Sequence, residues 1–85
     1  MFEIKYSNQS NKFLKKANKV LLERLIKKIE EIRKQPVMHD TKTVEGYEEK
    51  LFGFRVGDYR ILYEVNYEFN EIGIVKIDKR SKVYE

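Results

Sequence analysis

The hydrophobic pattern alternates at the start of the chain and then takes on a helical period. In residues 2–6 the apolar side chains fall on one side and the charged ones on the other, which is typical of a half-buried strand. Ser7 is a good N-cap for a following helix, and Asn18 interrupts the helical pattern. From Lys19 to Lys34 the predicted helix carries one apolar stripe, made of Leu22, Leu25, Ile26, Ile29 and Ile32. We expect this stripe to face the core and Pro36 to end the helix.

The second half of the chain predicts a loop followed by three strands. Residues 37–49 show no period, which is typical of a loop. Runs rich in β-branched and aromatic residues predict strands at about 50–56, 59–66 and 72–78. The order β-α-α-β-β-β indicates one α+β domain, residues 1–85. We expect an antiparallel β-sheet of about four strands with the two N-terminal helices packed on one face.

Gly57 and Asp58 form a two-residue turn between the first two of these strands. Pairing outward from the turn places Val56 against Tyr59, Arg55 against Arg60, Phe54 against Ile61 and Phe52 against Tyr63. The six apolar residues then share one face, and Arg55 and Arg60 lie side by side on the other. Like charges directly opposite in a sheet destabilise it by about 0.2–1 kcal/mol, so this pair indicates a bound anion. Phosphate fits best, because its oxygens match the arginine fork.

Positive charge is concentrated at the two ends of the chain. The formal net charge is +4, with a local excess of +6 in residues 1–36 and +2 in residues 76–85. This asymmetry favours a polyanionic partner, with nucleic acid first and an acidic protein second. A Lys- and Glu-rich surface that serves only solubility is the alternative.

Composition excludes several classes of protein. The chain has no cysteine and one histidine, which argues against a disulfide framework and a structural metal site. It has no apolar run of about 18 residues, so no membrane span is expected. The N-terminus lacks the apolar region of a signal peptide, which favours a cytoplasmic protein. Phosphate-cradling glycine loops and conventional hydrolase motifs are absent, and no cofactor is expected.

Arginine and tyrosine are the candidates that remain for chemistry. Arg80 and Tyr84 lie after the last predicted strand, which returns beside the hairpin and would bring Arg80 to the two arginines. Three cations for a phosphate and a ring for a splayed base suit RNA, whose 2′-hydroxyl is an internal nucleophile. His39 stands next to Asp40 in a loop without a second histidine, so we do not favour it as a catalytic residue. The remaining acidic residues are typical of a solvated loop and not of a hydrolytic carboxylate pair: Glu45, Glu48 and Glu49.

Two segments of the chain resemble the RelE/ParE toxin superfamily. The run LFGFRVGDYRILYEV (residues 51–65) and the run IVKIDKRSKVY (residues 74–84) carry the resemblance, which extends over essentially the whole chain. It implies a RelE-like fold and a toxin of a toxin–antitoxin pair. Members similar to RelE are endoribonucleases that cut mRNA in the ribosomal decoding site and are neutralised by an antitoxin that wraps around them.

The resemblance also implies roles for single residues. Arg55 corresponds to a basic residue that holds phosphate, and Arg60 to the arginine that stabilises the transition state. Arg80 corresponds to the arginine assigned to the leaving group or scissile phosphate, and Tyr84 to the tyrosine that orients the nucleotide. Further phosphate-binding candidates in these segments are Lys50, Lys79 and Lys82.

Two residues depart from the pattern of many relatives. Gly53 stands where they carry a second basic residue, so Lys50 or Lys79 would have to supply that charge. Asp78 stands near positions where they have histidine or glycine, and an acid there weakens RNA binding.

Several alternatives stay open from the sequence. The expected partners of an interferase are a RelB-like antitoxin, the ribosome and mRNA, without membrane or metal. Leu51 and Leu62 share the arginine face by alternation and suit an antitoxin's apolar helix or strand, or they are covered by the chain's own tail. A ParE-like DNA gyrase inhibitor is the rival function, and a degenerate toxin that only binds antitoxin or RNA is a third.

Overall fold

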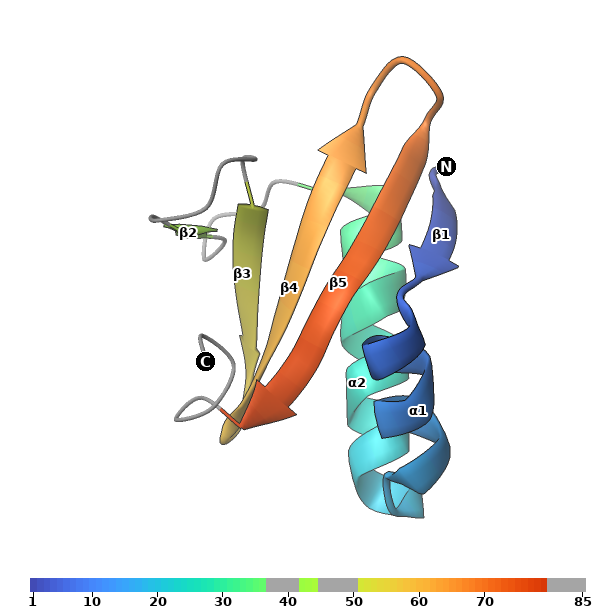
Figure 1. Ribbon diagram of the computed structural model, residues 1–85. Coiled ribbons are helices and arrows are strands. Elements are labelled where there is room, and N and C mark those ends of the chain that lie inside the picture. Colours follow the sequence, from blue (N-terminus) through green and yellow to red (C-terminus); the bar gives the residue numbers. More distant parts are fainter. Residues whose placement is uncertain (37–41, 45–50, 80–85) are drawn as a thin grey trace.

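The fold has two layers, a twisted five-stranded sheet and a pair of helices behind it (Figure 1). The computed structural model describes residues 1–36, 42–44 and 51–79. Its elements are β1 (Glu3–Tyr6), α1 (Asn8–Lys16), α2 (Lys19–Lys34), β2 (Lys42–Val44), β3 (Leu51–Val56), β4 (Tyr59–Asn66) and β5 (Glu71–Lys79). The expected α+β class and the order of its main elements are confirmed.

Both helices begin at the residues that the sequence predicts. The Ser7 side chain accepts a hydrogen bond from the Ser10 backbone N–H at the start of α1. Asn18 does the same for Leu21 at the start of α2, so it ends one helix and caps the next. At this point the chain reverses its direction, so that α1 runs down and α2 runs back up in Figure 1.

The buried stripe of α2 matches the predicted one at three of its five residues, and Leu22 is only half-buried. Leu25, Ile29 and Ile32 are buried as expected, but Ile26 is 38% exposed. Leu21 packs against the core in its place. The buried positions 25, 29 and 32 are spaced by four and three residues, so they lie along one narrow side of the helix.

The sheet order is β1-β5-β4-β3-β2, and its edge strands differ from the sequence prediction. The strands from β2 to β5 pair antiparallel, as expected, but β1 pairs parallel with β5 over residues 71–74. The second difference is β2 itself, because residues 42–44 lie in the segment predicted to be loop and pair with β3. This three-residue edge strand is too short to give a periodic signal in the sequence.

The register of the β3–β4 hairpin is the predicted one at all four pairs named above. Gly57 has a φ of +59°, the left-handed conformation that glycine adopts without a steric cost. The turn therefore determines which face each following residue occupies.

The core lies between the sheet and the helices, and a bulge in β5 keeps three isoleucines in it. Ile72, Ile74 and Ile77 are all buried in this cluster, although strict alternation cannot place 74 and 77 on the same face. The register shift between Leu62 and Tyr63 accommodates the extra residue. The bulge therefore decides the face on which the end of β5 displays its side chains.

The start of α1 completes the edge of β5 beyond the end of β1. The Ser7 hydroxyl donates to the Val75 carbonyl at 2.7 Å, and the buried Ser10 hydroxyl donates to the Ile74 carbonyl at 3.1 Å. The Gln9 amide donates to the Ile77 carbonyl at 2.7 Å and accepts from the Ile77 N–H at 3.0 Å. Three side chains thus act as a continuation of the strand ladder.

We predict that Gln9→Ala destabilises the protein by about 1–3 kcal/mol, because the Ile77 N–H loses its partner in a partly buried position. Urea denaturation measures the change. Asn11→Ala is the matched control on the exposed side of α1 and should leave the midpoint nearly unchanged. Equal midpoints for both variants would show that Gln9 does not support β5.

Candidate functional site

A row of three charged residues crosses the sheet on the face away from the helices. Arg55 in β3 pairs with Arg60 in β4, and Arg60 pairs with Asp78 in β5. Arg55 is exposed, and Arg60 and Asp78 are half-buried. The Arg55 Nε donates to the carbonyl of Gly57 at 3.3 Å, which directs its side chain along the turn. The predicted pairing of the two arginines is confirmed.

The carboxylate of Asp78 modifies the charge of this row. Its Oδ1 accepts a hydrogen bond from the Lys79 N–H at 2.8 Å. An acid directly across from Arg60 lowers the positive potential that an anion meets there. This register gives a physical basis for the expectation that Asp78 weakens the binding of RNA.

Lys79 lies on the other face of the sheet. It pairs with Tyr59, whose ring contacts Phe13 of α1 at a centroid distance of 5.7 Å. Alternation therefore separates Lys79 from the two arginines, and it cannot replace the charge absent at Gly53. The register partner of Gly53 in β2 is Lys42, which lies in the segment that the sequence predicted to be a loop.

Several predicted residues lie outside the described residues. Among the site candidates these are Lys50, Arg80, Lys82 and Tyr84, and among the disfavoured ones His39, Asp40, Glu45, Glu48 and Glu49. Their roles stay predictions.

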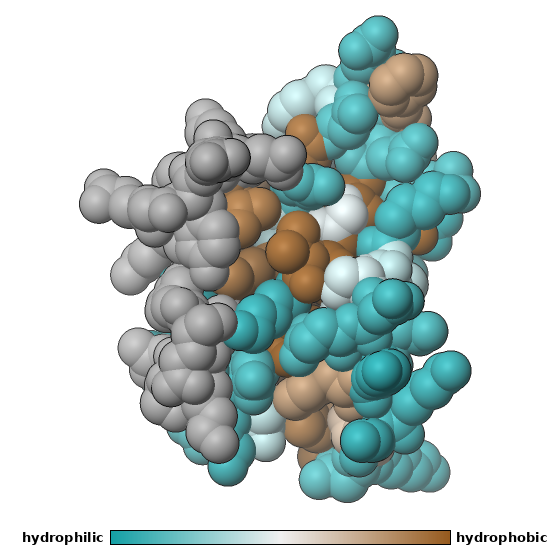
Figure 2. Space-filling view, viewed as in Figure 1, coloured by the Kyte–Doolittle hydropathy of each residue, from teal (hydrophilic) through white to brown (hydrophobic). Residues whose placement is uncertain are grey.

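Leu51 and Leu62 are on the arginine face, as alternation predicts, but the chain buries them. Their side chains are 4% and 1% exposed, and they form a second cluster with Val75 that is separate from the main core. Figure 2 shows hydrophobic side chains gathered on the middle of this face. Other residues of the chain thus cover the two leucines, and their contact with an antitoxin stays a prediction.

A pocket of about 290 Å³ lies where α2 meets the β3–β4 turn, and we call it the turn pocket. Its lining residues are Arg24, Lys27, Lys28, Glu31, Arg55, Val56 and Gly57. The sequence pattern did not predict the three cations that α2 contributes to this pocket, Arg24, Lys27 and Lys28, because on a helical pattern they look like ordinary surface residues. Only the packing of α2 against the hairpin brings them to Arg55.

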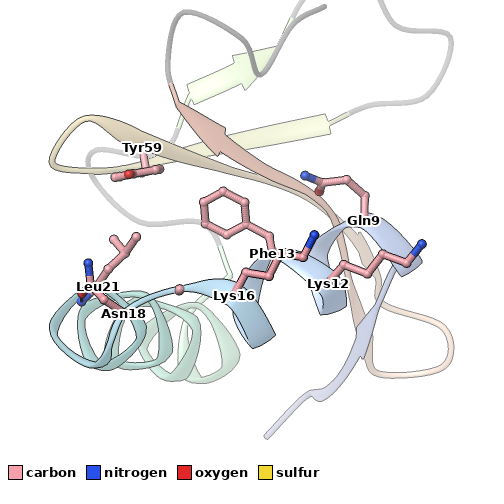
Figure 3. A pocket seen from close by; sticks show the side chains of 8 residues that line it. Gln9, Lys12, Phe13, Lys16, Asn18, Leu21 and Tyr59 are labelled. Carbon is pink, nitrogen blue, oxygen red and sulfur yellow. Dashed lines mark hydrogen bonds between the residues drawn. The ribbon is translucent and has the colours of Figure 1, made fainter.

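A larger hollow of about 470 Å³ lies between α1 and the hairpin (Figure 3). Phe13 projects from α1 into it, and Tyr59 lies across from Phe13 on β4. Lys12 and Lys16 contribute positive charge at its border. This aromatic hollow is on the opposite side of the sheet from the Arg55–Arg60 pair.

Two classes of site are absent from the described ranges. Residues 1–36, 42–44 and 51–79 contain no group of three or more histidine, aspartate or glutamate side chains that could hold a metal. None of the helices in these ranges combines the length and the apolar character needed to cross a membrane.

Comparison with known proteins identifies the family. The model for the ParE toxin of the type II toxin–antitoxin system parDE matches residues 4–84, nearly the whole chain. The chain belongs to the RelE/ParE toxin superfamily. The resemblance of the hairpin and the last strand to this superfamily is therefore confirmed.

Several solved structures of RelE proteins resemble this RelE/ParE toxin. The archaeal RelE–RelB complex from Pyrococcus horikoshii OT3 is 27% identical, with a TM-score of 0.80 over 96% of this chain and 98% of that one. The RelB–RelE antitoxin–toxin complex from Methanococcus jannaschii is 26% identical, with a TM-score of 0.71 and 95% of each chain covered. The intact E. coli RelBE complex is 20% identical with a TM-score of 0.80 over 93% of this chain and 96% of that one, which supports the fold. No curated protein matches the chain.

We predict that inorganic phosphate raises the melting temperature of this toxin, and that Arg60→Gln reduces the rise. An anion that binds only the folded state at several times its Kd adds about 1 kcal/mol, equivalent to ~4–8 °C for a domain of this size. Differential scanning fluorimetry at constant ionic strength, with chloride as reference, measures the effect. Lys34→Gln removes the same charge at the end of α2 and should keep the full rise. An equal rise in both variants would place the anion elsewhere.

Proposed function

We propose that this RelE/ParE toxin is a ribosome-dependent endoribonuclease that cleaves mRNA in the decoding site and so inhibits translation. The observation that carries the proposal is the direct pairing of Arg55 with Arg60 on the face away from the helices. Two guanidinium groups directly opposite each other destabilise the sheet by charge repulsion. The same two groups can donate hydrogen bonds to the oxygens of a phosphodiester. The likeness to solved RelE structures supports the same choice.

The proposed reaction is attack of a ribose 2′-hydroxyl on the neighbouring phosphorus, with departure of the 5′-oxygen. Arg60 stabilises the additional negative charge on the phosphoryl oxygens, and Arg55 holds the phosphate in position. Arg80 acts on the scissile phosphate or the leaving oxygen, and Tyr84 orients the nucleotide by stacking. These last two roles rest on the resemblance of the final segment to RelE.

The proposed partners follow from this reaction. They are the ribosome and mRNA in the cytoplasm, together with a RelB-like antitoxin that neutralises the single toxin domain. Several of the similar RelE structures were crystallised as complexes with RelB, which supports the antitoxin.

A ParE-like inhibitor of DNA gyrase is the second candidate, and the matching family model is the observation that favours it. The sequence at the end of β5 favours the ribonuclease instead. ParE-like chains usually carry a His-Gly-Arg step there, whereas this chain has Asp78-Lys79-Arg80. A degenerate toxin that binds only antitoxin or RNA is a third candidate, because Gly53 and Asp78 both reduce the positive charge of the site.

We predict that Arg60→Ala lowers ribosome-dependent cleavage by about 10²–10³-fold, because the variant loses a donor aimed at developing charge. The measurement is a map of 5′ ends on a defined mRNA, with and without ribosomes. Arg80→Ala should show a loss of the same order, and Lys34→Ala should cleave like the parent.

Two results would overturn the ribonuclease. Uncut mRNA with cleaved or relaxed plasmid DNA would assign the chain to gyrase inhibition. Uncut mRNA and unchanged DNA would assign it to the degenerate class.

We also predict that Asp78→Asn tightens RNA binding about two- to fivefold. This change removes the carboxylate opposite Arg60, and even a fully exposed pair of charges interacts by ~0.2–1 kcal/mol. Fluorescence anisotropy with a labelled single-stranded RNA gives the Kd. Glu68→Gln makes the same change in net charge at an exposed position in the β4–β5 turn. An equal effect from both would show that only net charge matters.

A further inference from the structure

The turn pocket is lined by four basic side chains and one acidic side chain. Among its charged residues, Lys28 and Glu31 pair with each other at 3.2 Å, and Lys28 also lies 4.4 Å from the centre of the Phe54 ring. Arg24, Lys27 and Arg55 form no ion pair within the part of the chain that the structure describes. Within the described ranges, this pocket of about 290 Å³ therefore carries a net positive charge.

The backbone at Gly57 leaves space for a guanidinium group over the turn. A Cβ at this position would lie 3.0 Å from Nη2 and 3.4 Å from Nη1 of Arg24. Arg24 therefore approaches the turn closely because residue 57 has no side chain. Since Arg55 also donates to the Gly57 carbonyl, two guanidinium groups from different elements flank the same peptide. Such paired forks are suited to a phosphate with two or more free oxygens.

The surroundings of the pocket favour a polynucleotide over a single anion. Arg24 also lines a neighbouring hollow of about 600 Å³ with Lys19 and Tyr59. Tyr59 in turn lines the aromatic hollow, where it faces Phe13 and two further lysines (Figure 3). Cations and rings thus follow one another from the turn to α1, which matches the repeat of phosphate and base in a single strand.

We propose that the groove between the β3–β4 turn and the two helices binds single-stranded RNA, with Arg24, Lys27 and Arg55 holding a phosphate and Tyr59 stacking a base. This inference rests on the proposed function for its ligand, but it concerns a separate surface from the Arg60 face. Arg55 lies at the turn between the two surfaces. An RNA strand held in the groove passes next to Arg55 on its way to Arg60, which positions the strand for cleavage.

The test is direct binding of a short, labelled 2′-O-methyl RNA, which cannot be cleaved. The double variant R24Q/K27Q removes two phosphate contacts and is compared with K15Q/K34Q, which removes the same charge from exposed positions outside the turn pocket. Titrations from about 50 to 200 mM salt give the slope of log K against log salt, which falls by ~0.7 for each lost contact with a single strand. Circular dichroism and thermal melts verify that every variant folds.

The proposal expects the slope to fall by about 1.4 in R24Q/K27Q and to change less in K15Q/K34Q. It expects Tyr59→Leu to weaken binding about tenfold or more at an unchanged slope, since base stacking contributes ~1–3 kcal/mol. Equal slopes in the two double variants would overturn it. The proposal would also be overturned if R24Q/K27Q bound RNA like the parent but no longer bound an acidic antitoxin peptide. That result would assign the groove to a protein partner.

These outcomes are distinct from failure of the ribonuclease. If the parent protein binds RNA through the groove but leaves ribosome-bound mRNA intact, the groove is supported and the proposed ribonuclease reaction is excluded. If R24Q/K27Q cleaves mRNA like the parent and binds RNA like K15Q/K34Q, the ribonuclease reaction is supported and RNA binding in the groove is excluded.

Discussion

The structure depends on supplying β5 with hydrogen-bond partners along both of its edges. β4 covers one edge completely, but on the other side β1 reaches only residues 71–74. The first turn of α1 bonds the remaining groups through Ser7, Gln9 and Ser10. An unpaired strand edge inside a small domain is costly and prone to association. The N-terminal segment therefore completes the hydrogen bonding of the sheet, although most of this segment is helical.

This arrangement links the core to the charged face. The bulge at the middle of β5 lies where the Ser7 and Ser10 hydroxyls bind the carbonyls of Val75 and Ile74. It keeps Ile77 in the core and so places Asp78 opposite Arg60. Without the extra residue, the end of β5 would present the alternate set of side chains to each face. The charge beside Arg60 thus follows from a backbone irregularity three residues before Asp78.

Much of the fold and part of the site could be predicted from the sequence. Local signals were sufficient for the two caps, the helix ends and the β3–β4 hairpin, because a Gly57 turn determines register on its own. The parallel pairing of β1, the strand at 42–44 and the bulge depend on contacts between distant residues, and no short pattern encodes them. The same limit applies to function. Arg55 and Arg60 were found because one hairpin brings them together, whereas Arg24 reaches the turn only through the packing of α2.

The parallel pairing of β1 with β5 also affects the order of folding during synthesis. Ser7 and Val75 are bonded although they lie 68 residues apart, so the chain must close a long loop before this contact forms. The helices and the β3–β4 hairpin are made earlier and consist mainly of local contacts. β5 must then be available before β1 gains a partner and before Arg60 gains Asp78 as its neighbour. A nascent chain that has not yet reached β5 therefore carries the arginine pair without Asp78 beside it, and the charged face is complete only after β5 has been made.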